Sequence, residues 1–502
     1  MTNADAARPA DSVPHQRVPT LDALFRFNAA RHPNEIALTA TAGDGDGGEA
    51  QSYTYSHADR VIGRIARRLR EEIGLPTDSV VCIQLPNRVE AIFAALAVTR
   101  AGLIPAFLPL LWRRAECVAA LTRAHAKAII TCDRAAGFNH AQLAMDVAAE
   151  VFPIRAVMAF GAALPDGVIA LDDTLTRGTN IELDLVTGDA PPDEASSLAA
   201  ITFDVALDGP RPVERDPIQL MASGLLICDR AAIDRQAAIV STIPAATYAG
   251  LACVLMPWLV TAGRLICHET FAPDALSAGL QDEGSGAVLV VPQSIALRMQ
   301  DADPAIYAGF DAIIAIHRAP ERLATSPAWN LERPGLVDVA AFGEIAMLAA
   351  RRNLGSRAAP WPLGPVRIAS GAGTKEIASV ALLPSGTLGI QGLLTVPPRR
   401  QANDSAPDHT DTGYGCARYA DGTALTVNAA PAGFANVGGY RFATGDLQAA
   451  LRSIDSGGLI AALPNALSGH RLAGHARKLD EVRETLDELG LNPLVSGAFR
   501  RP

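Results

Sequence analysis

Lysine, whose compact ammonium group commonly binds phosphate or acts as a nucleophile, is scarce in this chain. Only Lys127, Lys375 and Lys478 are present among 43 basic residues, and the others are arginines. A coding bias toward arginine explains this composition. Any mechanism that needs a lysine ammonium group therefore has three candidates at most. Lys478 falls in the charged stretch Arg477–Glu488, which we predict to be a helix with solvated side chains.

The cysteines do not form a recognisable metal or redox motif. The chain has no CxxC pair, which argues against a zinc ribbon and a thioredoxin-type site. Single, widely spaced cysteines are typical of reduced thiols in a cytosolic protein, so we expect a cytoplasmic location. The seven residues are Cys82, Cys117, Cys132, Cys228, Cys253, Cys267 and Cys416.

Two further patterns that could carry chemistry are weak here. The glycine-rich segment Gly43–Gly48 is acidic and does not open a helix after a strand, so we interpret it as a surface loop rather than a phosphate loop. A Gly-x-Ser-x-Gly motif is absent, and no Ser-His-Asp arrangement is recognisable. The sequence therefore does not support a hydrolytic or purely thioester-side activity, although that class stays open as a third alternative.

Composition and charge exclude some classes of partner. The chain has 502 residues, 49 % of them apolar, and a formal net charge of −10. Its length predicts two to four domain-sized units with large cores. The acidic balance argues against nucleic-acid binding and against a polybasic membrane anchor. Met1–Val18 lacks the apolar run of a signal peptide, and Ala249–Val260, the nearest approach to a membrane span, is too short and contains Pro257.

The elements that must position any site alternate between helix and strand in the first two thirds of the chain. This alternation predicts parallel sheets covered by helices. Leu21–Arg31, Ser56–Ile73 and Arg88–Ala101 are predicted helices. The predicted strands of the first series are Val80–Gln84, Ile129–Cys132 and Ala156–Phe160.

A second series of the same kind is predicted to begin with Ala199–Phe203. Its other strands are Ile239–Ser241, Arg264–His268, Ala287–Val291 and Ala312–Ile316. From Val366 onwards, short strands separated by Gly, Pro and Ser predict a small antiparallel unit instead. These later strands are Val380–Leu383, Thr387–Gln391 and Ala424–Val427.

The order of these elements resembles the adenylate-forming (AMP-binding) superfamily, which includes acyl-CoA synthetases, aryl-CoA ligases and peptide-synthetase adenylation domains. Tyr53–Tyr55 resembles the family's "TY" strand, Val81–Asn87 its "V.i.lpN" strand and Ala101–Pro105 its "aGaip" segment. The resemblance extends from about Leu21 to Arg441. Because these motifs belong to the scaffold, they indicate the fold and not the activity.

The resemblance implies a domain organisation. We expect a flexible N-terminus over 1–18 and a large α/β domain over 19–435. That domain would contain two α/β subdomains, 19–195 and 196–365, and a small β-barrel, 366–435. A reduced α+β C-terminal domain would follow over 436–502, because Gly438–Phe442 resembles the family's "GGyri" start and few residues separate it from the last motif.

The family's phosphate loop, rich in hydroxyls and glycine and ending in Pro-Lys-Gly, corresponds to Asp204–Glu214. The hydroxyls are lost, Val213 stands at the lysine position, and Pro210 and Pro212 lack N–H donors. Gly209 and Arg211 are the remaining nucleotide-binding candidates. The resemblance therefore predicts weakened binding of a triphosphate.

The family's Tyr-Gly-x-Thr-Glu motif corresponds to Phe342–Ala346. Phe342 and Gly343 keep the aromatic-glycine turn and are candidate nucleotide contacts, whereas Ile345 and Ala346 replace the phosphate-binding threonine and the Mg²⁺-binding glutamate. Glu344 lies two residues earlier and is the candidate catalytic and metal-binding carboxylate; the alternative is an exposed or capping glutamate. His317–Ala319 replaces the glycines that wall the adenine.

Two further motifs are altered. In the family's Thr-Gly-Asp motif, Thr412 is kept, Tyr414 replaces the ribose-binding aspartate, and Asp411 is the candidate substitute. At the family's final lysine stands His470, the second catalytic candidate, whose imidazole is shorter than a lysine and mostly neutral at pH 7. The acyl pocket of the family corresponds to Pro244–Leu251.

Within that segment, Thr247, Tyr248 and Gly250 are the candidate acyl-pocket residues; the alternative is a helix N-terminus packed in the core. Because phosphate, metal, ribose and lysine positions change together, we favour a family member with lost or much reduced ATP-dependent adenylation. Such a protein would bind an acyl group or nucleotide, or act as a regulator. The alternative is an active ATP-dependent carboxylic acid–CoA ligase that uses atypical residues.

The resemblance also implies partners and cofactors. ATP or AMP, Mg²⁺ and CoA are the family's cofactors, and a small carboxylic or acyl compound is the expected ligand. A protein partner or a homodimer stays open, and we expect no nucleic acid and no transmembrane segment.

Overall fold

The computed structural model describes residues 18–41, 51–175, 198–269, 276, 286–371, 373–397 and 408–500. The predicted loop Gly43–Gly48 and nearly all of the predicted flexible N-terminus lie outside these residues. The described chain is a mixed α/β structure, which confirms the predicted fold class. Within the described residues, no helix has both the length and the apolar character needed to cross a bilayer.

The first large sheet has seven strands and is mostly parallel. Its buried strands are short apolar runs, as expected where helices cover both faces of a parallel sheet. In spatial order the strands are β11 (Gly209–Arg215), β10 (Ala200–Ala206), β4 (Ile104–Phe107), β3 (Val80–Ile83), β5 (Ala128–Cys132), β8 (Ala156–Phe160) and β9 (Ile169–Ala170).

The second large sheet has eight strands with a parallel centre and antiparallel edges. Its two outermost strands on one side come from the N-terminal part of the chain. In spatial order the strands are β17 (Ala346–Arg352), β16 (Gly335–Phe342), β15 (Phe310–His317), β14 (Ala287–Pro292), β12 (Ala238–Ser241), β13 (Arg264–Cys267), β1 (Ile36–Ala40) and β2 (Gln51–Thr54).

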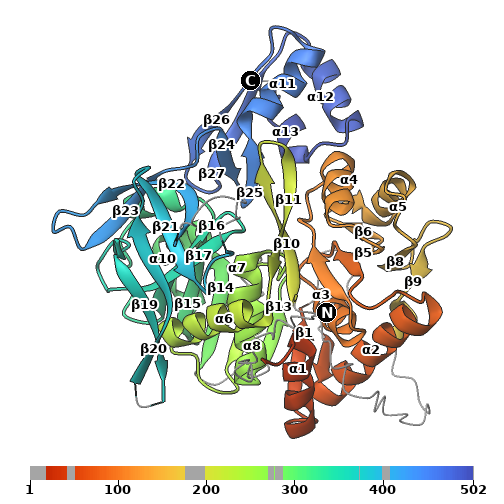
Figure 1. The fold of residues 1–502 in the computed structure, drawn as a ribbon, viewed down its shortest axis with the longest axis horizontal. Helices are drawn as coiled ribbons and strands as arrows, with labels where there is room; N and C mark the ends of the chain where they lie inside the picture. Colours follow the sequence, from red (N-terminus) through yellow and green to blue (C-terminus); the bar gives the residue numbers. More distant parts are fainter. Residues whose placement is uncertain are drawn as a thin grey trace, which may run out of the picture.

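The two sheets exchange segments in a way that differs from the predicted order. The strand expected to begin the second series, β10, instead pairs with β4 and with β11 at the edge of the first sheet. In return, β1 pairs with β13 in the second sheet. The reason is burial, since the apolar face of β10 packs into the core that contains Ile104 and Trp112. Figure 1 shows β10 and β11 as a long hairpin at the edge of the first sheet.

Helices cover these sheets and begin at recognisable caps. Thr20 caps the first helix by accepting a hydrogen bond from the backbone N–H of Ala23 at 3.1 Å. Asp216 and Gln219 form a capping box around the first turn of the helix that begins at Pro217. The helices are α1 (Leu21–Arg31), α2 (Tyr55–Arg67), α3 (Val89–Arg100), α4 (Arg114–Arg123), α5 (His140–Glu150), α6 (Pro217–Ala231), α7 (Tyr248–Gly250), α8 (Met256–Thr261), α10 (Gln293–Ala302), α11 (Thr444–Ile454), α12 (Leu479–Glu488) and α13 (Pro493–Ser496).

The remainder of the chain forms two smaller antiparallel sheets. The six-stranded sheet follows the order β18 (Trp361–Pro362), β23 (Ala424–Ala429), β22 (Thr410–Arg418), β21 (Thr387–Gly392), β20 (Gly373–Leu382) and β19 (Gly364–Ser370). The four-stranded sheet follows the order β25 (Tyr440–Ala443), β24 (Phe434–Val437), β27 (Gly469–His475) and β26 (Leu459–Asn465). A minor hairpin joins β6 (Arg134–Ala135) and β7 (Phe138–Asn139).

The four-stranded sheet and α11 to α13 share a core of their own, centred on Leu451, Leu472 and Phe499. This C-terminal unit sits above the two large sheets (Figure 1). It contacts α4 directly, because the backbone N–H of Ala115 donates to the oxygen of Gly490 at 3.0 Å and the N–H of Asn492 donates to the carboxylate of Glu116 at 2.8 Å. These contacts place the unit over the carboxyl ends of the strands, where the candidate site lies.

Candidate functional site

A cavity of about 620 Å³ lies at the carboxyl ends of parallel strands, where α/β proteins place their ligand sites. Residues after β12, β14 and β15 line it, together with part of β10. The C-terminal unit closes it with two segments, Gly438–Arg441 and the turn Asn465–Gly469. The cavity therefore lies between the large sheets and the C-terminal unit.

The segment at the phosphate-loop position is a regular hairpin. β10 and β11 pair residue by residue from Ala200↔Arg215 to Ala206↔Gly209. The predicted nucleotide contacts Gly209 and Arg211 lie at or near its turn, and neither lines the cavity. The exposed Arg211 is bound by the adjacent Asp208 at 2.8 Å. These residues therefore form paired strands and not the open, hydroxyl-rich loop with which the family surrounds a triphosphate.

Glu344 is buried and already has partners on both carboxylate oxygens. Arg318 lies 2.7 Å from Oε1, and the backbone N–H of Tyr248 donates to Oε2 at 2.6 Å. The side chain of Glu344 is only 3 % exposed. Arg318, the bulky cation at the predicted adenine-wall position, therefore forms an ion pair with the candidate metal carboxylate.

A second arginine, Arg215, contacts the turn that contains Glu344. Arg215 is fully buried, lies 3.5 Å above the ring of Tyr248 and donates to the backbone oxygen of Glu344. Burial lowers the pKa of this guanidinium. The hydroxyl of Tyr248 is 2.6 Å from that of Ser223. Of the predicted acyl-pocket residues, Thr247 lines the cavity, whereas Tyr248 packs in the core beneath it.

Gly250 lies in α7, and a Cβ there would be 2.4 Å from the oxygen of Pro244, so only glycine fits this close approach. The residue supports the loop that carries Thr247 without lining the cavity itself.

A second charged pair joins the C-terminal unit to β10. Arg441 donates to both carboxylate oxygens of Asp204, at 3.1 and 2.9 Å, and its guanidinium lies 4.2 Å from the centre of the Phe434 ring. Gly343 lies directly against this pair, with φ of +60°. A Cβ at Gly343 would be 2.7 Å from Asp204 Oδ1 and 2.8 Å from Arg441 Nη1. The glycine of the aromatic-glycine turn is therefore needed for the pair to form.

We expect Gly343→Ala to lower the free energy of unfolding by about 2–4 kcal/mol, from the left-handed backbone and the contact with the ion pair. Gly355→Ala is a matched control, because Gly355 has φ of +71° and nothing lies within 4 Å of the added carbon. Urea titration of both variants isolates the contact. Equal losses in the two variants would show that the ion pair does not depend on Gly343.

The remaining predicted residues lie in different environments. Phe342 is buried and packs edge-to-face on Tyr414 at 5.3 Å. Thr412 is also buried and donates to the oxygen of Leu388 at 2.8 Å. Asp411 is exposed on β22 and accepts from the backbone N–H of Gly413. None of these side chains lines the cavity.

His470 lies just outside the cavity on β27. Its Nδ1 is 3.2 Å from the backbone oxygen of Asn436, and because that oxygen can only accept, Nδ1–H donates. The same nitrogen is 4.0 Å from Oε1 of Glu321, whose pKa is raised by burial. The histidine therefore contacts the boundary between the C-terminal unit and the 3₁₀ helix Pro320–Thr325.

One buried network was missed by the sequence analysis. His317 Nε2 is 2.9 Å from Asp338 Oδ1, and Arg352 donates to both oxygens of Asp338, at 2.8 and 2.7 Å. Burial opposes ionisation of Asp338, but hydrogen bonds and charges of His317 and Arg352 outweigh it and lower its pKa. A lone aspartate inside the otherwise apolar strand β16 was the available signal, because a buried charge needs a partner.

Comparison with known proteins identifies the fold. A model of the AMP-binding enzyme family matches residues 25–203. The amide bond synthetase McbA of Marinactinospora thermotolerans is 18 % identical, with a TM-score of 0.66 and 94 % of each chain covered. The search of curated proteins found no match.

Two other solved structures give the same result. The o-succinylbenzoate CoA synthetase MenE of Bacillus subtilis is 14 % identical, with a TM-score of 0.67, covering 95 % of this chain and 93 % of its own. A malonyl-CoA ligase bound to methylmalonyl-CoA and AMP is 16 % identical, with a TM-score of 0.64, covering 92 % of this chain and 94 % of its own. The predicted resemblance to the adenylate-forming superfamily is thus confirmed.

The residues of this adenylate-forming fold do not fit the family's nucleotide and metal. Arg318, at the predicted adenine-wall position, lines the cavity, and Asp204 with Arg441 fills the space against the Gly343 turn. Oε2 of Glu344 accepts a hydrogen bond from the N–H of Tyr248, and Oε1 is held in an ion pair with Arg318. Within the described ranges, no group of three or more His, Cys, Asp and Glu residues is placed to hold a metal ion.

Proposed function

We propose that this protein binds a small carboxylic or acyl ligand in its cavity and does not adenylate it. The observation that carries the proposal is the pairing of Glu344 with Arg318 at 2.7 Å. A carboxylate held in a buried ion pair would have to lose that partner before it could bind Mg²⁺, at a cost of several kcal/mol. The hairpin of β10 and β11 and the Asp204–Arg441 pair support the same conclusion.

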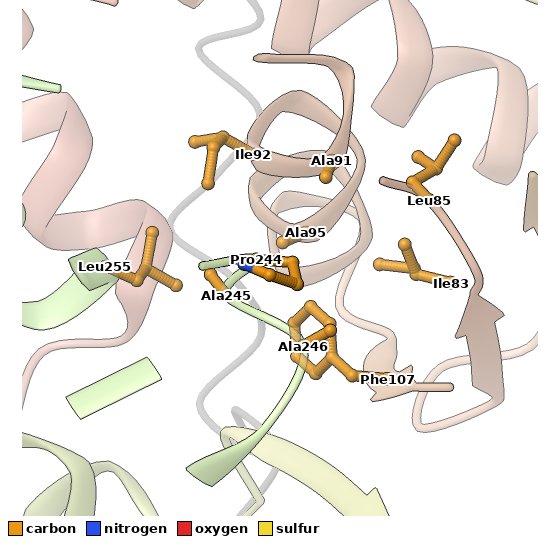
Figure 2. Close-up of a pocket in the computed structure, with 10 residues that line it drawn as sticks. All are labelled: Ile83, Leu85, Ala91, Ile92, Ala95, Phe107, Pro244, Ala245, Ala246 and Leu255. Atoms are coloured by element: carbon orange, nitrogen blue, oxygen red, sulfur yellow. The ribbon is translucent and has the colours of Figure 1, made fainter. Parts of the chain in front are cut away.

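The cavity itself supports retention of a ligand. Its volume of about 620 Å³ is within the usual range for small-molecule sites. A smaller apolar void of about 10 Å³ adjoins it and shares Leu85, Pro244 and Ala246 with its wall. Figure 2 shows side chains of α3, of the end of β3 and of the Pro244–Ala246 segment around this void. The apolar wall of the cavity therefore continues toward α3.

The test is ATP–pyrophosphate exchange with a broad panel of carboxylic acids. We expect no exchange above a protein-free background, because the cations and carboxylates of the phosphate side neutralise one another. A thermal-shift series with ATP, AMP, CoA and the same acids is run in parallel, and we expect stabilisation by an acid without ATP. Exchange above background with any acid would favour the alternative, an ATP-dependent carboxylic acid–CoA ligase that uses atypical residues.

A further inference from the structure

The polar end of the cavity is formed by the carboxyl ends of two neighbouring strands. β14 and β15 run in parallel with Pro292 beside Ile316, so α10, which begins at Gln293, starts next to His317. Residues 292–295 all line the cavity, and no side chain caps the helix. The first N–H groups of α10 therefore face the cavity with the positive end of the helix dipole.

His317 supplies a second, independent indication of a ligand. Its side chain is only 3 % exposed, and it lines the cavity. Nε2 of the ring is hydrogen-bonded to Asp338. Nδ1 has no hydrogen-bond partner within the described chain and is not fully enclosed by other atoms. A buried imidazole with one open nitrogen at a cavity wall is a polar group that a ligand can satisfy.

Among the described residues, three arginines line the cavity, and one of them differs from the other two in having no ion-pair partner. Arg318 is paired with Glu344 and Arg441 with Asp204, whereas Arg322 makes no ion pair with any described carboxylate. Arg322 lies in the 3₁₀ helix that follows β15 and lines the same cavity as residues 292–295. The side chain of the adjacent Glu321 is buried and interacts electrostatically with Arg322 without forming an ion pair with it, and burial raises the pKa of this carboxyl. Within the described chain, the cavity therefore offers one arginine outside an ion pair together with an uncapped helix N-terminus.

We propose that the N-terminus of α10, Arg322 and His317 form a subsite for a single negative charge, the carboxylate of an amphipathic monoanion. The apolar part of this ligand contacts Leu85 and Phe203, which line the same cavity. This inference rests on the proposed function and places the acid group at the N-terminus of α10. One unpaired cation can balance the charge of a monoanion. The additional charges of a polyphosphate would meet Arg318 and Arg441, whose charges Glu344 and Asp204 already balance.

Isothermal titration calorimetry with decanoate and 4-phenylbutyrate, and with decanol as a neutral control, tests the subsite in the full chain. We expect wild type to bind decanoate at least about tenfold more tightly than decanol, and Arg322→Gln to remove most of that preference, since the variant loses the charge-assisted bond to the carboxylate. Arg298→Gln is the matched control on the exposed side of α10, with an expected change below about twofold.

Ser294→Asp separates binding from folding. A carboxylate in the first turn of a helix stabilises the helix, yet it places a negative charge at the subsite. We expect the variant to melt no lower than wild type while binding decanoate at least about tenfold more weakly. Loss of binding with a lowered melting temperature in Ser294→Asp, but unchanged binding in Arg322→Gln, would contradict the subsite.

The outcomes distinguish the subsite from the proposed function. Equal decanoate affinity in wild type, Arg322→Gln and Ser294→Asp overturns the subsite and leaves the proposed ligand-binding function standing. Wild-type protein that binds neither decanoate nor 4-phenylbutyrate overturns both the subsite and the ligand-binding part of the proposed function. Acid-dependent pyrophosphate exchange overturns the proposed absence of adenylation and leaves the position of the subsite to be judged by the variants.

Discussion

An Arg318→Met variant is expected to unfold with a free energy about 3 kcal/mol lower than that of wild type. Removing one partner of a buried ion pair leaves the other charge uncompensated, which typically costs 3–5 kcal/mol. Glu344 is 3 % exposed, so water cannot replace the guanidinium. The loss should fall at the low end, because the N–H of Tyr248 still donates to Glu344 and Arg215 remains close.

Chemical denaturation of a double-mutant cycle checks this expectation. Arg318→Met combined with Glu344→Gln should recover a large part of the loss, because no buried charge is left alone. Arg333→Met is the control, since Arg333 pairs with Asp311 at the surface with 72 % of its side chain exposed, and exposed pairs contribute little. Additive losses in the double variant would mean that Arg318 and Glu344 do not stabilise one another.

The second large effect is a loss of stability in mild acid. Burial lowers the pKa of His268 to about 4, and burial with the nearby Arg113 charge lowers that of His140 to about 4. Within the part of the chain that the structure describes, both ring nitrogens of His268 are enclosed and have no hydrogen-bond partner. In the unfolded chain these imidazoles protonate near pH 6.5, so below that pH protons bind the unfolded state preferentially. The stabilisation is complete above pH 6.5 and is lost as the pH falls toward 4.

Each histidine is expected to remove at most about 3 kcal/mol of unfolding free energy between pH 6.5 and 4. His268→Met should flatten the dependence by about that amount, because methionine fills a similar volume and does not titrate. His475→Met, at an exposed position, should leave the profile of wild type unchanged. Urea titrations at several pH values measure the effect, and a His268→Met profile parallel to wild type would refute it.

Local patterns predicted most elements of the fold. Leu21–Arg31 forms the predicted helix with the same bounds, and Ala156–Phe160 forms the predicted strand. The predicted helix Ser56–Ile73 is α2 followed by a π-helical turn over Arg68–Glu72, so its continuity was predicted and its change of hydrogen bonding was not. Apolar periodicity depends on neighbouring residues, and for that reason it is readable from the sequence.

The candidate site was less predictable because its interactions join distant parts of the chain. Motif positions led to Glu344, Gly343 and Thr247, and the catalytic and binding roles of Glu344 and His470 stay predictions. The pairing of Asp204 with Arg441 spans 237 residues and leaves no mark in either local pattern. A sequence motif predicts the loss of a catalytic group at a single position. The ion pairs that balance the remaining charges form only in the folded chain.

The sequence by itself therefore determined the adenylate-forming fold, while the replacement of the family's phosphate, metal, ribose and lysine residues stays a prediction. Only the tertiary structure decided that β10 joins the first sheet, that Arg318 pairs with Glu344 and that Arg322 makes no ion pair with a described carboxylate. The physical reason is the separation along the chain over which each kind of interaction acts. Strand and helix propensities act over a few residues, while ion pairs, burial and cavities depend on which elements the whole core brings together.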